Sequence, residues 1–296
     1  MSKIPVGATI AQGYNFGFAR FFTLLKLMWL PLAIMLASNY FLIPLLVRVM
    51  APAQNNAAAG VWLLIPLLYL AILVMIFAQF VAIAQYALEM KNNLGWFTLP
   101  LGKPVWRLIG AFVLVLLIMI GVMMVAGLLM GGIAAALAAL AKPGPGVFAG
   151  LMTGIVMLVL YGAFLYGIVR LMFLLTPVVV AESRIGIGRS WKLGRGNFWR
   201  MFIVLVAIFL PVLVLEVLAL TFLPGFPRMQ PGAPEQVRAA MLAWEVSLLG
   251  RMTDYWFIVY PVFGVIMVAF YGMLIGAQCF AYRALVPAET EVDVFA

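Results

Sequence analysis

The sequence predicts an all-α integral membrane protein with six transmembrane helices. Two observations lead to this prediction: the apolar composition of the chain and the length of its apolar stretches. Hydrophobic residues make up 67% of the 296 residues and charged residues only 9%, with a mean hydropathy of +1.18. A soluble domain is roughly half apolar and a quarter charged, so this chain needs lipid as its solvent. Six stretches reach the ~20 apolar residues that a membrane-crossing helix needs. They are residues 27–50, 61–88, 105–141, 147–180, 201–223 and 255–286.

The segment before the first stretch, residues 1–26, predicts a short interfacial helix on the cytoplasmic side, because it is glycine-spaced and aromatic. The first stretch itself predicts a retained anchor. A cleaved signal peptide is the alternative, but the apolar run continues through Val47, beyond the roughly 7–15 residues of a signal-peptide core.

The fourth stretch is too long for one straight crossing. Residues 147–180 would make about 51 Å of helix at ~1.5 Å per residue, against a hydrocarbon core near ~30 Å. We expect the helix to protrude or to break, with Pro177 as the interruption. Two pairs of small residues, Gly127/Gly131 and Gly150/Gly154, predict close approach of helix backbones, either within the chain or in a homodimer.

The segment between the fifth and sixth stretches, residues 224–254, predicts a periplasmic loop that carries an amphipathic helix up to Gly250. Val237, Met241, Trp244 and Leu248 share one face at the helical period. We expect this face to lie on the bilayer surface. Docking of a partner protein is the alternative.

Aromatic-plus-basic segments around Arg20, Arg107 and Arg200 precede three of the six stretches. This weak repeat predicts three helical hairpins in parallel orientation within a single polytopic domain, residues 1–296. If the N-terminus is cytoplasmic, twelve of the eighteen Lys and Arg residues fall on inner segments and five on outer ones. The positive-inside rule therefore predicts a multi-pass protein of the bacterial inner membrane with both termini in the cytoplasm.

Charged residues inside the apolar stretches are costly and suggest function. Arg170 and Glu216 are expected to pair, either to fix helix register or to form a polar site for a headgroup or ion. The loop of residues 181–200 carries a net charge of +4 with interleaved aromatic residues, so we expect it to bind anionic headgroups of the inner leaflet. Nucleic acid is not an expected partner, because interfacial tryptophan explains the aromatic residues. The candidate lipid- or amphiphile-binding residues are Arg170, Glu182, Arg189, Trp191, Lys192, Arg195, Trp199, Arg200 and Glu216.

Residues 170–200 also carry a family resemblance. Arg170 lies within an apolar stretch, Pro177 follows, Glu182 stands at the helix exit, and residues 188–193 (Gly-Arg-Ser-Trp-Lys-Leu) and 196–200 (Gly-Asn-Phe-Trp-Arg) come next. This order resembles the membrane domain attached to some bacterial glycerophosphoryl diester phosphodiesterases, and its stand-alone uncharacterised inner-membrane relatives. The six-helix layout extends the likeness loosely to the whole chain. That phosphodiesterase works from a separate soluble barrel with catalytic histidine, and this chain has no histidine. The resemblance therefore implies architecture and not catalysis.

The composition argues against enzyme activity. Without histidine and with the single cysteine Cys279, the chain offers no imidazole metal site, CxxC motif or disulfide within the chain. The sequence has no pair of carboxylates placed for acid–base or metal chemistry, so we expect no metal and no cofactor. The expected function is a non-enzymatic membrane protein that binds or helps move a lipid or other amphiphile. The alternative is an accessory or assembly subunit of a larger membrane complex, with a membrane protein as its partner.

Overall fold

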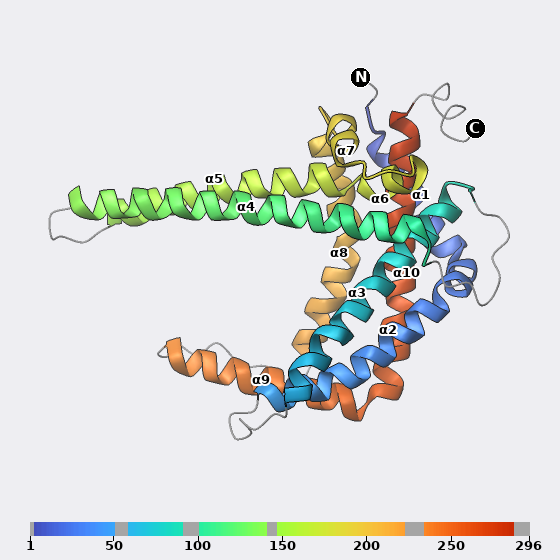
Figure 1. Cartoon of the computed structure of the whole chain (residues 1–296), viewed down its shortest axis with the longest axis horizontal. Helices are drawn as coiled ribbons and strands as arrows, with labels where there is room; N and C mark the ends of the chain where they lie inside the picture. The colour runs from blue at the N-terminus through green and yellow to red at the C-terminus, as the bar shows by residue number, and fades with distance from the viewer. Residues whose placement is uncertain (1–2, 51–58, 91–100, 141–146, 223–233, 287–296) are drawn as a thin grey trace.

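The computed structural model of the chain describes residues 3–50, 59–90, 101–140, 147–222 and 234–286. Within these residues the regular structure is helical, with no strand (Figure 1). The helices are α1 (Val6–Ala19), α2 (Phe21–Met50), α3 (Ala59–Ala87), α4 (Lys103–Leu140), α5 (Val147–Met172), α6 (Leu175–Ala181), α7 (Ile187–Leu193), α8 (Phe198–Phe222), α9 (Pro234–Asp254) and α10 (Trp256–Leu285).

The predicted fold class is confirmed. Among the described residues, six helical segments are long and apolar enough to cross a membrane. Five of them are α2, α3, α4, α8 and α10, and α5 together with α6 makes the sixth. The main difference from the sequence expectation is at the first span, where the helix already begins at Phe21.

The predicted break in the fourth span is also confirmed. Helix α5 ends at Met172 and α6 begins at Leu175, so the interruption falls just before Pro177. Proline has no backbone N–H and is tolerated in the first turn of a helix, where that N–H needs no partner within the helix. All seven residues of α6 are buried, so the break brings a short helix into the protein interior.

The most extensive contact between two described helices involves α1, which lies antiparallel along the second half of α10 (Figure 1). A Cβ atom added at Gly13 would lie 2.9 Å from the Cβ of Ala277. One added at Gly272 would lie 3.1 Å from the Cα of Gly17, and one at Gly276 would lie 2.7 Å from the ring of Phe16. The predicted short helix before the first span is therefore present, but it lies along the candidate span α10 and not crosswise to it as expected of an interfacial helix. Its glycines, Gly13 and Gly17, allow it to pack closely along the length of α10.

The three predicted hairpins do not share one direction. Figure 1 shows the α4–α5 hairpin extending to one side of the molecule, crosswise to α8 and α10. The reason lies on α4, where Val105, Leu108, Ala111 and Val115 form a buried face in its first turns. These turns pack against α3 and α6, and the following residues as far as Leu129 are mostly exposed.

Close packing within the chain at the α4 and α5 glycines is not found where the structure describes it, and the homodimer alternative stays a prediction. A Cβ atom at Gly127, Gly131 or Gly154 would meet no heavy atom within 4 Å. A cavity of about 550 Å³ instead separates the helices beside Gly127 and Gly154. Gly150 lies outside the residues whose surroundings are described. Larger side chains, such as Met123 and Phe164, also line this cavity.

Helix α9 confirms the predicted helix in the segment 224–254. Met241, Trp244 and Leu248 on the predicted apolar face are half-buried, whereas Leu242 and Ser247 are exposed. The helix packs against α2 and α10 of the same chain. Val237, the fourth residue of the predicted face, lies outside the described side chains.

Candidate functional site

The basic loop of residues 181–200 is folded against the bundle. Its centre forms α7, and the fully buried Ser190 fixes that helix in place. The Ser190 hydroxyl donates a hydrogen bond to the carbonyl of Leu171 at 2.8 Å. Because this carbonyl lies just before the break between α5 and α6, the bond ties α7 to the end of the fourth span.

Arg170 lies beneath α7 and is only 8% exposed. Its Nη1 donates to the hydroxyl of Tyr166 at 2.7 Å, and its Nε donates to the carbonyl of Trp191 at 3.2 Å. The guanidinium carbon lies 3.8 Å from the ring centroid of Trp191, a cation–π contact. Gly194 leaves room for this arrangement, because a Cβ there would lie 3.1 Å from Arg170 Cγ.

Glu182 gathers a second set of contacts at the exit of α6. Its carboxylate accepts hydrogen bonds from the guanidinium of Arg184, from Nε of Arg189 at 3.0 Å and from the hydroxyl of Tyr282 at 3.4 Å. The Glu182 side chain is 6% exposed. A carboxylate this enclosed needs such partners, since an unpaired buried charge is strongly unfavourable. The acid thus anchors the loop to α10.

Arg200 and Asn197 hold the start of the chain. Nη1 of Arg200 donates to the carbonyl of Ile4 at 2.7 Å, and the N–H of Ile4 donates to Oδ1 of Asn197 at 3.1 Å. The side chain of Ile4 is fully buried. These two hydrogen bonds fix the backbone that leads into α1.

The predicted site residues therefore fall into separate groups. Arg170 meets Trp191, Glu182 meets Arg189, and Arg200 meets the N-terminal segment. Lys192, Arg195 and Trp199 are exposed. Glu216 lies on α8, but its side chain is outside the described set, so its pairing with Arg170 stays a prediction.

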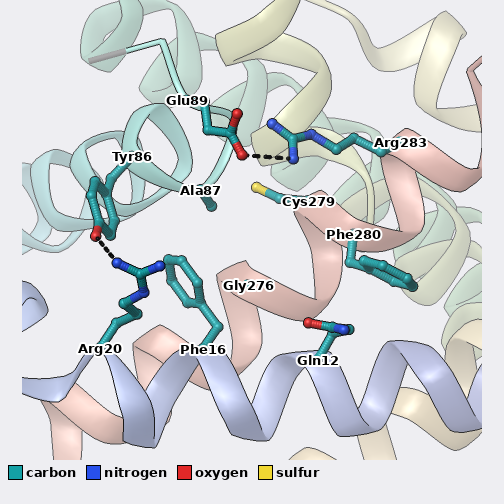
Figure 2. A pocket seen from close by; sticks show the side chains of 10 residues that line it. All are labelled: Gln12, Phe16, Arg20, Tyr86, Ala87, Glu89, Gly276, Cys279, Phe280 and Arg283. Atoms are coloured by element: carbon teal, nitrogen blue, oxygen red, sulfur yellow. Dashed lines mark hydrogen bonds and ion pairs between the residues drawn. The ribbon is translucent and has the colours of Figure 1, made fainter. Parts of the chain in front are cut away.

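A different group of residues lines an open cavity of about 380 Å³ between α1, the end of α3 and α10. Figure 2 shows Arg20 and Tyr86 along one side of this space and Glu89 and Arg283 along another, with Cys279 between them. The lining residues are Gln12, Phe16, Arg20, Tyr86, Ala87, Glu89, Gly276, Cys279, Phe280 and Arg283. None of the nine predicted site residues is among them.

The packing of α1 on α10 builds this cavity. Gly276 lets the ring of Phe16 approach the α10 backbone, and Arg20 follows at the junction of α1 and α2. Nη1 of Arg20 donates to the hydroxyl of Tyr86 at 3.3 Å, which links the junction to α3. The cavity therefore depends on three helices that are distant in sequence.

Glu89 enters the cavity on an unusual backbone. Its φ is +60°, a left-handed conformation that costs a residue with a Cβ roughly 1–2 kcal/mol. The N–H of Glu89 donates to the carbonyl of Tyr86 at 3.1 Å, and the N–H of Met90 donates to that of Gln85 at 2.9 Å. This is the Schellman ending of a helix, with glutamate where glycine is usual. It directs the carboxylate toward Arg283, whose Nη1 lies 3.4 Å from Glu89 Oε1.

The cavity carries two guanidinium groups and one carboxylate, so its net charge is positive. Phe16, Phe280, Ala87 and Cys279 supply apolar wall beside these charges. Such a mixture suits a molecule with an anionic group and an apolar part. Within the described residues, no three acidic or thiol side chains come together in a way that could hold a metal ion.

Another cavity, of about 330 Å³, has an apolar wall that includes Phe77, Phe112 and Phe209. Gln278 also lines it, and the buried Oε1 of this side chain has no hydrogen-bond partner among the described residues.

From the sequence, Arg20 marked one of the three aromatic-plus-basic segments, and neither Glu89 nor Arg283 was a candidate site residue. The available signal was that Glu89 directly follows the stretch 61–88 and that Arg283 is a charge within the last turn of the stretch 255–286. Pairing Glu89 with Arg283 across 194 positions needed the fold.

No protein-family model matches the chain, and neither a curated protein nor a solved structure matches it. The likeness of residues 170–200 to the membrane domain of glycerophosphoryl diester phosphodiesterases therefore stays a prediction.

Proposed function

We propose that this chain is a non-enzymatic protein of the bacterial inner membrane that binds, or helps to move, a lipid or other amphiphile. The observation that carries the proposal is the cavity lined by Arg20, Glu89 and Arg283 together with apolar side chains. A guanidinium offers several N–H donors to an anionic group. The neighbouring phenyl rings offer surface to an apolar one.

The contacts of the basic loop change the expected roles of its residues. Arg170, Glu182 and Arg200 hold the loop and the N-terminal segment within the protein. We assign ligand binding to the cavity instead. The exposed Lys192, Arg195 and Trp199 remain suited to contact with anionic headgroups of the surrounding inner leaflet.

The first experiment compares lipids that remain bound after extraction in a mild detergent. Mass spectrometry of the intact protein would identify a retained lipid class in the unaltered chain. We expect the double variant Arg20→Gln/Arg283→Gln to lose that lipid, because both cavity cations are removed.

The matched control is Lys192→Gln/Arg195→Gln, which removes the same charge from exposed positions on and beside α7. This control should keep the lipid. Equal retention by the unaltered protein and the cavity variant would contradict the proposal. Equal loss from both double variants would indicate general attraction to basic residues and also count against the cavity.

The alternative, an accessory or assembly subunit, has one observation in its favour. The outer part of α4–α5 exposes apolar side chains around the open glycines Gly127 and Gly154, and this surface could receive a helix of a membrane protein partner. The same mass spectra test this alternative. A protein partner at fixed stoichiometry would favour it, and its loss on Gly127→Leu would locate the contact.

A further inference from the structure

The ion pair between Glu89 and Arg283 is loosely held. The nitrogen–oxygen distance is 3.4 Å, and the side chains are 75% and 38% exposed respectively. Strong guanidinium–carboxylate hydrogen bonds are shorter, about 2.7–2.9 Å, and exposed pairs add little stability. The contact joins Nη1 of Arg283 to Oε1 of Glu89. The carboxylate can therefore leave at small cost.

The weakly paired Glu89 also has a left-handed backbone conformation, with φ at +60°. Glycine would fill the left-handed position without strain, yet the chain places a carboxylate there, at the edge of the cavity. Strained residues of this kind concentrate at binding sites and switch regions. The geometry is that of a carboxylate held beside Arg283 at the edge of the cavity.

We propose that Glu89 is a built-in counter-ion for Arg283, and that the ligand is a lipid phosphomonoester whose phosphate displaces it. This inference rests on the proposed function, because it names the ligand class of the same cavity. With Glu89 displaced, Arg20 and Arg283 present two positive charges. A phosphomonoester carries about −1.5 to −2 charge at pH 7, which matches them. A phosphodiester carries only a single negative charge, no more than the carboxylate that it must displace.

The test measures binding of dioctanoyl phosphatidic acid and dioctanoyl phosphatidylglycerol to the full chain in detergent. We expect the phosphomonoester to bind more tightly. Glu89→Gln keeps the shape of the side chain and removes its charge, so it should bind phosphatidic acid up to about fivefold more tightly, the most that an exposed ion pair usually contributes. Glu89→Asp keeps the charge near Arg283 and is the matched control, so it should gain less affinity than Glu89→Gln.

Two further variants separate the counter-ion role from folding. Glu89→Gly removes both the charge and the backbone strain, so it should fold well and also bind more tightly. In an Arg283→Gln background, Glu89→Gln should give no gain, because the cation that it competes for is absent. A gain that persists in this background would overturn the proposal, as would equal binding by the unaltered protein and Glu89→Gln.

Glycerol 3-phosphate distinguishes a lipid from a soluble phosphate ester. Much weaker binding of glycerol 3-phosphate than of phosphatidic acid would support a lipid ligand. Equally tight binding would overturn that part of the proposal. If Arg20→Gln/Arg283→Gln releases a lipid but Glu89→Gln changes nothing, the counter-ion inference fails while the proposed function stands. If no variant affects lipid retention, both fail.

Discussion

At the scale of single residues, Arg170 is enclosed by two aromatic rings and the end of α7. Its hydrogen bonds to Tyr166 and Trp191, together with the ring contact at 3.8 Å, use the planar shape of the guanidinium. Lysine cannot reproduce this geometry, because its ammonium is compact and strongly hydrated.

The first prediction follows from this enclosure. Arg170→Lys should lower the free energy of unfolding by about 1–3 kcal/mol, because it loses a charge-assisted hydrogen bond and the stacking on Trp191. Thermal unfolding in detergent measures the change. Arg195→Lys, at an exposed position, is the control and should stay within about 0.5 kcal/mol. Equal stability of the two variants would contradict the structural role of Arg170.

The sequence singled out Arg170 but not its partners. An arginine within an apolar stretch is visible from composition alone. Its contact with Trp191 depends on the helix interruption after Met172 and on the position of α7, which packs against that interruption. Neither feature follows from hydropathy, which is why Glu216 was the expected partner.

At the scale of helices, glycines of α1 and α10 allow these two helices to pack closely. A Cβ atom on Gly17 would lie 3.0 Å from the carbonyl oxygen of Ala269 and 3.0 Å from the backbone nitrogen of Met273. These backbone atoms cannot move without shifting α10. In contrast, a Cβ on Gly121 of α4 would meet no atom within 4 Å.

The second prediction compares these two glycines directly. Gly17→Ala should destabilise the protein by about 1–3 kcal/mol through overpacking. Gly121→Ala should be neutral or stabilising by up to about 1 kcal/mol, because alanine favours a helix more than glycine does. Unfolding in mixed micelles of increasing denaturing detergent measures both. A Gly121→Ala variant as unstable as Gly17→Ala would show that the difference in packing is not what determines stability.

At the scale of the whole molecule, α7 and α9 lie at opposite ends of the helix bundle. Figure 1 shows α7 near the start of α1 and the end of α10, and α9 at the other end of the bundle. Because α8 and α10 are long enough to span a bilayer between these ends, α7 and α9 should lie on opposite sides of the membrane.

The third prediction states which side is which. With the native Cys279 replaced by serine, Lys192→Cys on α7 and Ser247→Cys on α9 provide single exposed thiols. A membrane-impermeant maleimide should label residue 247 in cells with a permeable outer membrane, and residue 192 only after the inner membrane is opened. This is the result that the excess of inner basic residues predicts. Labelling in the reverse order would invert the predicted orientation.

The sequence alone determined the membrane class, the six helices long and apolar enough to span a membrane, the helix break just before Pro177 and the half-buried face of α9, because each depends on the composition or spacing of neighbouring residues. Only the tertiary structure decided which side chains meet. Arg200 holds the backbone of Ile4 across 196 positions, and Glu89 pairs with Arg283 across 194. The direction of α4–α5 and the cavity beside α10 likewise depend on which helices pack together. The apolar composition of the helices shows that they need a lipid environment, but any apolar face of a helix can contact lipid equally well. Close contacts between specific residues therefore select how the helices pack together.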